Sequence, residues 1–249
     1  MRAPRSIFFD VMCRLKPTNA WRELSSEGAI EVPAFLDKDW ASEMQRVVSE
    51  IYAELAAARE AETPALLENK DLEYHFTAWR GVNLKQLPRY LRATRPDLAA
   101  SFGRLVNHIH GQTGTLFGPG WRFIPTRSWF RRHVGVARKV PWHIDADAAA
   151  VRGHGNRAFN VWLPLEPVGK DLPSLDVIRG SHMAMRELPL LKPPDIYRDD
   201  DFASGKGEAA TALLEPGDAL IFDQYTLHRT QQAGSEETIR TACEFRFAI

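Results

Sequence analysis

The sequence predicts a mainly β fold with flanking helices, because its two halves differ in pattern. Up to about residue 115, apolar residues recur at three- and four-residue steps, whereas later short strand-like runs alternate with Gly, Pro and Asp. Helical runs followed by many strands indicate a sheet domain with helices packed outside it. The 249 residues, 44% hydrophobic and 26% charged, suit one domain over 1–249: an N-terminal arm (1–20), a mostly helical outer layer (21–115) and a strand-rich core (116–249).

Two helical regions and one short strand are expected before residue 115. Asp37 is a suitable N-cap for a long helix that should stop before Pro64. A second helical region runs from about residue 87 to residue 110 and is broken at Arg95-Pro96. Residues 28–32 alternate in the manner of a strand.

Six strand-like runs make up the second half, at residues 121–133, 140–148, 158–165, 174–179, 219–223 and 238–247. The segment EPGD (residues 215–218) is a strong turn signal directly before the fifth run. Residues 192–208 form the one long polar insertion, which is either a solvated surface loop or a lid over a site.

Composition excludes several classes of partner. Lys plus Arg and Asp plus Glu balance at 32 each, so no global charge attracts the chain to nucleic acid or to an anionic membrane. No apolar stretch approaches the roughly 20 residues of a membrane span, and Asp10 and Arg14 interrupt the basic N-terminus, unlike a signal peptide. Cys13 and Cys243 cannot build a disulfide framework. We therefore expect a soluble, cytoplasmic protein that binds neither nucleic acid nor membrane.

The stretch VPWHIDAD (residues 140–147) contains two metal-ligand side chains at a spacing of two. On an extended strand, His143 and Asp145 leave the same face. A neutral imidazole and a carboxylate side by side are two thirds of the facial triad that binds non-haem Fe(II). Because His-x-Asp alone is a common tripeptide, a metal site requires a third ligand elsewhere in the chain.

His228 is the best candidate for that third ligand. It follows the turn at 215–218 and an apolar strand, which would place it at the mouth of a barrel. A lone histidine there is usually a surface or hydrogen-bonded residue, but the pairing with His143 and Asp145 favours a ligand. Three protein ligands on one face would leave three iron positions open.

The last predicted strand carries two arginines on one face, together with Ala242 and Glu244. A guanidinium is the side chain best suited to clamp a carboxylate through two parallel hydrogen bonds. Arg240 and Arg246 lie roughly 20 Å apart on an extended strand, so they cannot both hold one end of a small acid. We prefer Arg240, with Ala242 beside it leaving room. Arg246 is expected to pair with Glu244 or another carboxylate, or to meet substrate.

Four stretches, taken in order, carry a resemblance to a known family. They are the strand and helix start at 28–40, the His-x-Asp motif at 141–145, the turn VIRGSH at 177–182, and residues 216–228 followed by Arg240. In this order they resemble the phytanoyl-CoA dioxygenase-like family of Fe(II)/2-oxoglutarate-dependent dioxygenases, over about residues 22–249. Arg179 stands where the family's Pro-Gly-Ser-His turn usually has proline, and His182 in this turn is expected to be a structural hydrogen-bonder.

The resemblance implies a double-stranded β-helix (jelly roll, cupin-like), with residues 116–249 as the jelly-roll core. His143, Asp145 and His228 would hold Fe(II). The cosubstrate 2-oxoglutarate would chelate this iron, while Arg240 binds its distal carboxylate. With O2 as the other cosubstrate, the expected reaction hydroxylates a small organic substrate and releases succinate and CO2; desaturation or ring formation would use the same residues. Asp145 argues against a halogenase, in which a small residue leaves room for chloride.

Further polar residues near the motif are candidates for binding cosubstrate or substrate. By family analogy, Ser128 or Arg132 on the strand before the motif helps to hold 2-oxoglutarate, although the sequence does not fix which strand face looks inward. Asn160 would reach the cosubstrate or substrate, or else satisfy backbone groups. The candidate substrate contacts are Trp142, Asp147 and Arg246.

Two other functions would use the same scaffold. A cupin-like metalloenzyme would use the triad without 2-oxoglutarate, and the carboxylate clamp discriminates between the two. A catalytically silent binding module would usually have lost a ligand, and none is lost here. A group of arginines near the presumed mouth either favours an anionic substrate, with a carboxylate or phosphate, or forms an ordinary solvated rim. These arginines are Arg127, Arg131, Arg132, Arg138 and Arg152.

Overall fold

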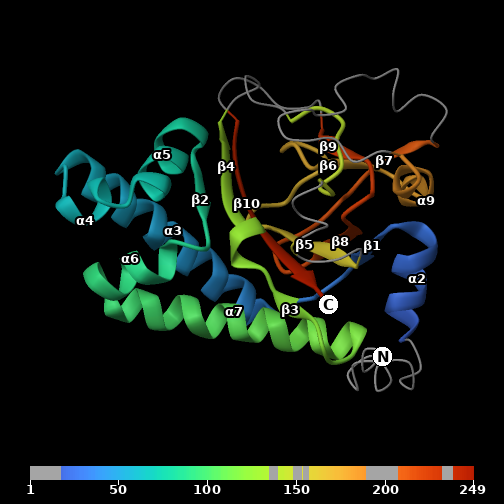
Figure 1. The fold of residues 1–249 in the computed structure, drawn as a ribbon, viewed down its shortest axis with the longest axis horizontal. Coiled ribbons are helices and arrows are strands. Elements are labelled where there is room, and N and C mark those ends of the chain that lie inside the picture. The colour runs from blue at the N-terminus through green and yellow to red at the C-terminus, as the bar shows by residue number, and fades with distance from the viewer. Residues whose placement is uncertain (1–17, 135–139, 148–152, 154–156, 189–206, 232–237) are drawn as a thin grey trace, which may run out of the picture.

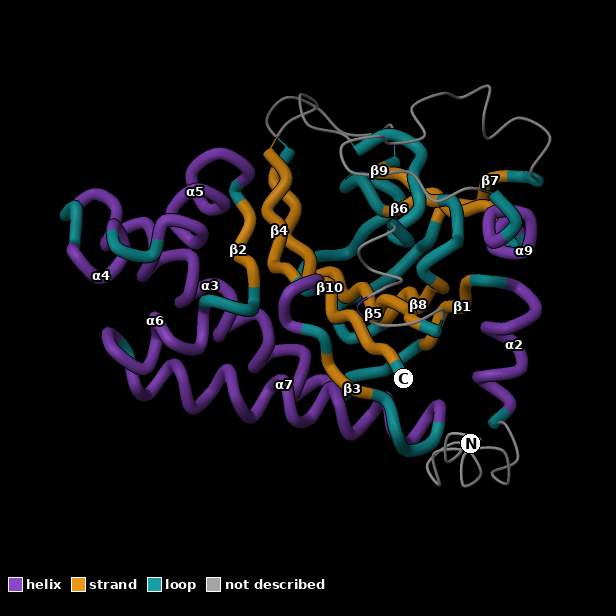
Figure 2. The backbone as a smooth tube through the Cα atoms, viewed as in Figure 1, coloured by secondary structure: helices purple, strands orange, loops and turns teal. Residues whose placement is uncertain are grey.

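The computed structural model describes residues 18–134, 140–147, 153, 157–188, 207–231 and 238–249. Long helices lie along one side of the strands (Figures 1 and 2). A seven-stranded sheet has the order β1-β8-β5-β10-β4-β2, with β3 also pairing with β10, and a three-stranded sheet has the order β7-β6-β9. The strands are β1 (Ala29–Val32), β2 (Gly81–Asn83), β3 (Arg122–Phe123), β4 (Trp129–Val134), β5 (Ala158–Pro164), β6 (Leu175–Ile178), β7 (Ala209–Thr211), β8 (Ala219–Asp223), β9 (His228–Thr230) and β10 (Ile239–Ala248).

The two predicted helical regions are present. Helix α3 (Lys38–Glu60) starts after Asp37, whose carboxylate accepts a hydrogen bond from the backbone N–H of Trp40 at 2.9 Å. Helices α6 (Leu87–Thr94) and α7 (Pro96–Phe117) separate at Arg95, because proline disfavours helical backbone in the residue before it. The other helices among the described residues, which the sequence did not predict, are α2 (Asn19–Glu27), α4 (Pro64–Leu67), α5 (Lys70–Trp79), the 3-10 turn η1 (Pro125–Arg127) and α9 (Ser181–Arg186).

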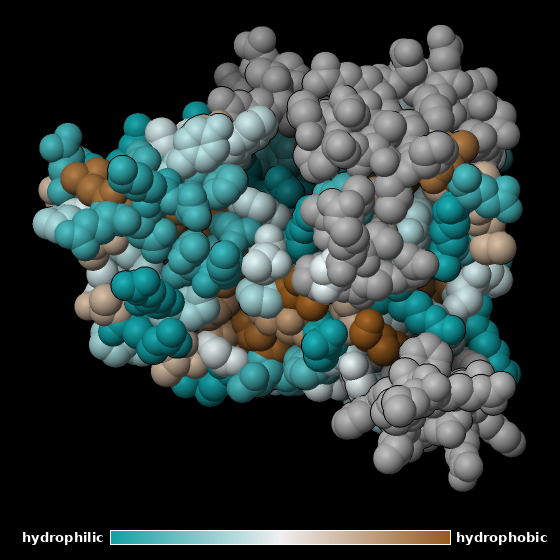
Figure 3. All heavy atoms as spheres, in the orientation of Figure 1, coloured by the Kyte–Doolittle hydropathy of each residue, from teal (hydrophilic) through white to brown (hydrophobic). Residues whose placement is uncertain are grey.

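Helices α3 and α7 cover one face of the seven-stranded sheet. Met44 of α3 is fully buried in the same cluster as Val161 of β5 and Phe245 of β10, while the outward surface of the helical layer is mainly hydrophilic (Figure 3). Because side chains alternate across a strand, the intervening residues point the other way, where Trp162 of β5 joins a cluster with Val177 of the small sheet. The face of β10 that carries Arg240 and Arg246 therefore looks away from the helices.

The strands agree with the sequence in five places and differ in three. The runs at 28–32, 158–165, 174–179, 219–223 and 238–247 are confirmed within one or two residues at their ends. The run at 121–133 divides into β3, η1 and β4. The prediction of a strand at 140–148 was wrong for residues 140–147. They form no strand, and His143 makes only an isolated bridge to His228. Short strands β2, β7 and β9 were not expected. Most of the predicted N-terminal arm and of the polar insertion lies outside the described residues.

Gly28 connects α2 to β1 in a way that only glycine permits. Its backbone φ is +75°, and a Cβ atom at this position would lie 2.3 Å from Nδ1 of His182. The other ring nitrogen of His182 hydrogen-bonds the carbonyl of Ser25 at 3.0 Å. The expected structural role of His182 is thus confirmed, since α9 is tied to α2 through it.

Among the described helices, none has the combination of length and apolar character that crossing a bilayer demands.

Candidate active site

His143, Asp145 and His228 come together in the structure. Their ligand atoms all lie within 4.8 Å of one another, and Nε2 of His228 is 3.7 Å from Oδ2 of Asp145. The two histidines are paired through their backbones, with N–H to carbonyl distances of 2.9 and 3.0 Å. This pairing brings His143 and His228 together although they lie far apart in the sequence, and their ring centres are 4.1 Å apart.

Each imidazole is oriented by a main-chain carbonyl. Nδ1 of His143 hydrogen-bonds the carbonyl of Pro141 at 2.8 Å, and Nδ1 of His228 hydrogen-bonds that of Thr226 at 2.9 Å. Because a carbonyl only accepts, Nδ1 must carry the proton, and the Nε2 lone pair is free for a metal. Burial lowers the pKa of His143 to about 3, so this ring is neutral at pH 7.

Asp145 is held in its ionised form. Burial opposes ionisation, but the Arg246 guanidinium outweighs it and brings the pKa of this carboxyl well below its usual value. Two neutral imidazoles and one carboxylate are a donor set suited to Fe(II) and related divalent ions.

Arg240 is buried without a full set of hydrogen-bond partners. Its side chain is 1% exposed, and its guanidinium carbon lies 5.2 Å from the centre of the Trp162 ring. Nε and Nη2 have no hydrogen-bond partner among the described residues. Burial lowers the pKa of Arg240 to about 10, although Glu166 and Glu244 favour the charged form. A buried cation with free donors fits the carboxylate of a bound ligand.

A family model described as "Phytanoyl-CoA dioxygenase (PhyH)" matches residues 24–242. The chain belongs to this family. The resemblance seen in the sequence is confirmed. The imidazole–carboxylate donor set fits the Fe(II) expected for a PhyH protein, and the incompletely bonded guanidinium of Arg240 fits the expected 2-oxoglutarate.

Solved structures confirm the jelly-roll fold. EctD from S. alaskensis, solved with 2-oxoglutarate and 5-hydroxyectoine, is 17% identical with a TM-score of 0.62, over 91% of this chain and 74% of that one. AviO1 from Streptomyces viridochromogenes is 15% identical with a TM-score of 0.55, over 92% of each chain. HygX from Streptomyces hygroscopicus, with nickel and 2-oxoglutarate bound, is 13% identical with a TM-score of 0.57, over 91% of this chain and 85% of that one. No curated protein sequence matches the chain.

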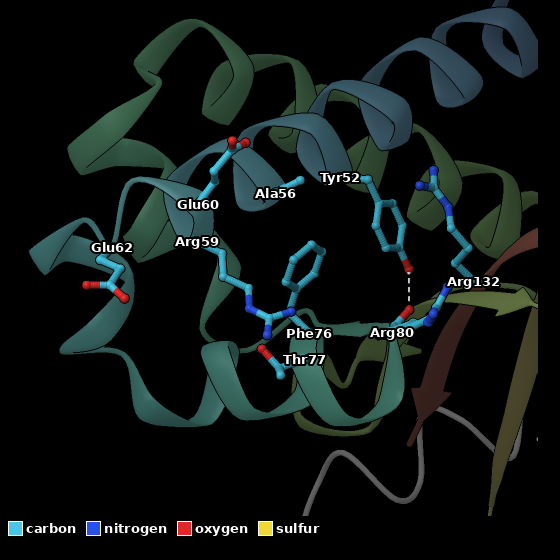
Figure 4. A pocket seen from close by; sticks show the side chains of 9 residues that line it. All are labelled: Tyr52, Ala56, Arg59, Glu60, Glu62, Phe76, Thr77, Arg80 and Arg132. Carbon is cyan, nitrogen blue, oxygen red and sulfur yellow. Dashed lines mark hydrogen bonds between the residues drawn. The ribbon is translucent and has the colours of Figure 1, made fainter.

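Ser128 and Arg132 of this PhyH protein are engaged away from the triad. The Ser128 hydroxyl donates to the carbonyl of Ile124 at 2.8 Å and accepts from the backbone N–H of Arg246 at 2.9 Å. The guanidinium of Arg132 lies 4.0 Å from the centre of the Tyr52 ring, in a cavity of about 660 Å³ beside α3 and α5 (Figure 4). Their predicted contact with 2-oxoglutarate therefore gains no support, because Arg132 points toward the helices and Ser128 is bonded to main chain.

Two of the predicted substrate contacts also have partners within the protein. Trp142 is 4% exposed, and the Arg229 guanidinium lies 4.6 Å from its ring centre. Asp147 accepts two hydrogen bonds from Arg127, at 2.9 and 3.2 Å. Trp142 is thus a core residue beside His143, and the charge of Asp147 is balanced by Arg127. Neither placement favours substrate contact.

Arg131 lies near the candidate site, although the sequence does not distinguish it from the other arginines of the presumed mouth. Its Nε donates to Oε2 of Glu244 at 2.8 Å, and its guanidinium lies 5.1 Å from the Trp129 ring centre. Because it pairs in register with Ala242, it lies on the face of the sheet opposite Arg132. Its side chain is 42% exposed. The sequence shows that Arg131 and Arg132 lie on opposite faces of this strand. Only the register with β10 decides which of them faces the site.

Proposed function

We propose that this PhyH-family protein is an Fe(II)- and 2-oxoglutarate-dependent oxygenase that hydroxylates a small organic substrate and releases succinate and CO2. The observation that carries the proposal is the His143–Asp145–His228 cluster on the same side of the sheet as the buried guanidinium of Arg240, whose Nε and Nη2 have no partner among the described residues. The cluster suits Fe(II), and the guanidinium suits the distal carboxylate of a dicarboxylic cosubstrate.

Each residue has a defined task in this proposal. His143, Asp145 and His228 hold Fe(II), which when bound supplies the redox chemistry with O2 and 2-oxoglutarate. Arg240 orients 2-oxoglutarate from its far end, because two parallel hydrogen bonds fix both position and direction. The burial of Arg240 and His228 keeps water from competing with these contacts.

The clamp favours this function over that of a cupin-like metalloenzyme working without 2-oxoglutarate. A buried guanidinium with free donors costs free energy in a ligand-free protein, because Glu166 and Glu244 compensate only part of its lost hydration. An anionic ligand removes that cost. A metalloenzyme without a dicarboxylic cosubstrate has no need for this residue.

We further propose that the substrate carries an anionic group. Arg131 faces the same side as Arg240 but leans toward Glu244, so it does not compete for the cosubstrate. One edge of its guanidinium is bonded to Glu244, and the half-exposed remainder is accessible to a carboxylate or phosphate.

The test is succinate formation with a panel of small carboxylates and phosphates. Turnover should require both Fe(II) and 2-oxoglutarate, and His143→Ala should remove it. Arg132→Met is the matched control, because Arg132 lies on the opposite face, and this variant should retain turnover. Absence of succinate with every substrate, together with absence of 2-oxoglutarate binding, would contradict the proposed function.

A further inference from the structure

The direction of the Asp145 side chain is not set by a regular strand. Within residues 140–147, the only strand-type pairing is the bridge between His143 and His228. Asp145 itself is attached by its backbone N–H to the carbonyl of Gln224, at 2.9 Å. Strand alternation therefore cannot aim this carboxylate at the two imidazoles, and other groups must do so.

Two residues of the seven-stranded sheet bind the Asp145 carboxylate. Nη2 of Arg246 lies 2.7 Å from Oδ2, and Nδ2 of Asn160 donates a hydrogen bond to the same oxygen. Nη1 of Arg246 also reaches the backbone carbonyl of Asp145, at 3.5 Å. The Arg246 guanidinium thus contacts both the side chain and the main chain of Asp145.

Arg246 and Asn160 are in turn fixed to each other. They face one another in the register of β10 and β5, and Nε of Arg246 donates to Oδ1 of Asn160 at 2.8 Å. Both are buried, at 4% and 0% exposure, on adjacent strands of the sheet. A donor pair on packed strands has little freedom, so it can hold a ligand side chain within a narrow range of directions.

We propose that Arg246 and Asn160 are positioning residues that hold the Asp145 carboxylate in place for the metal. The inference rests on the proposed function, since it concerns the same iron site. It gives Arg246 a different task from Arg240: Arg246 acts on a metal ligand, and Arg240 acts on the cosubstrate. Partners that orient metal ligands usually contribute about 10- to 100-fold to metal affinity, and we expect a loss in this range on their removal.

The experiment measures the Kd of Mn(II), as an air-stable probe, by calorimetry on the full chain and its variants. Arg246→Met and Asn160→Ala should each raise the Kd by about 10- to 100-fold. Arg246→Lys keeps the charge but lacks the planar fork whose separate nitrogens bond Asn160 and Asp145, so its Kd should lie between those of the wild type and Arg246→Met. Asn160→Ala and Arg246→Lys keep the inference testable if Arg246→Met does not fold.

Arg186→Met is the matched control for the loss of a partly buried ion pair. Arg186 on α9 bonds Asp223, whose side chain is 8% exposed. This variant should lose stability in denaturant unfolding yet keep the wild-type Kd for Mn(II). Folded Arg246 and Asn160 variants that bind Mn(II) as tightly as the wild type would overturn the positioning role alone. A wild-type protein that binds no Mn(II) would overturn the proposed function itself.

Discussion

Replacing Arg240 with methionine removes the proposed clamp while keeping an unbranched apolar side chain beside Trp162. Truncating one partner of a buried, hydrogen-bonded charge pair costs about 2–5 kcal/mol. Because 1.4 kcal/mol is a factor of ten, the Kd for 2-oxoglutarate should rise about 30-fold at least and up to several thousand-fold. Mn(II) affinity should be unchanged, since no hydrogen bond or ion pair among the described residues joins Arg240 to the three metal ligands.

In the absence of 2-oxoglutarate, Arg240→Met should not destabilise the protein. Nε and Nη2 of Arg240 are buried without a partner among the described residues, so methionine removes a desolvation cost that Glu166 and Glu244 only partly offset. The free energy of unfolding without 2-oxoglutarate should therefore stay equal or increase, although most buried substitutions reduce it.

Anaerobic calorimetry with Mn(II) and 2-oxoglutarate measures the first effect, and urea unfolding measures the second. Arg132→Met is the control, because Arg132 stacks on Tyr52 on the helical side and should leave the Kd for 2-oxoglutarate unchanged. If Arg240→Met binds 2-oxoglutarate as the wild type does, or if Arg132→Met weakens binding, the assignment of the clamp is wrong.

Three further changes test other parts of the structure. Asp145→Ala should abolish the rise in Tm that Mn(II) causes in the wild type, because a carboxylate ligand is lost. Burial and two neighbouring guanidinium groups lower the pKa of His133 to about 3, below the value of about 6.5 in an unfolded chain. As the pH falls below about 6.5, the unfolded state therefore takes up the proton first, and the free energy of unfolding should decrease down to about pH 3. His133→Gln should make this decrease shallower in urea unfolding at pH 7, 5.5 and 4; an unchanged slope would contradict the buried, neutral state of His133. Gly28→Ala should lower the free energy of unfolding by more than about 1 kcal/mol, because of its positive φ and the close His182 ring, whereas Gly103→Ala in helix α7, with open space around its Cβ, should not.

Local signals in the sequence predicted the main helices, and its ordered motifs predicted that His143, Asp145 and His228 come together. The N-cap at Asp37 and the proline at Pro96 act within one turn of chain, so the start of α3 and the break before α7 could be predicted. The order of His143, Asp145, His228 and Arg240 along the chain is enough to indicate the family.

Contacts between distant strands could not be predicted from the sequence. The inward face of β4 depends on its register with β10, so Arg131 and Arg132 could not be told apart. The partner of Arg246 was expected to be Glu244 or another carboxylate; Glu244 bonds Arg131 instead, and the carboxylate bound by Arg246 is that of Asp145. Residues 140–147 resemble a strand in sequence, yet long-range hydrogen bonds rather than a ladder hold them.

A crystal structure of the protein with Mn(II) and 2-oxoglutarate bound tests the central claim most directly. It should show the metal held by His143, Asp145 and His228, and the distal carboxylate of 2-oxoglutarate on Arg240. A metal bound elsewhere, or a distal carboxylate on Arg246 instead of Arg240, would contradict the account.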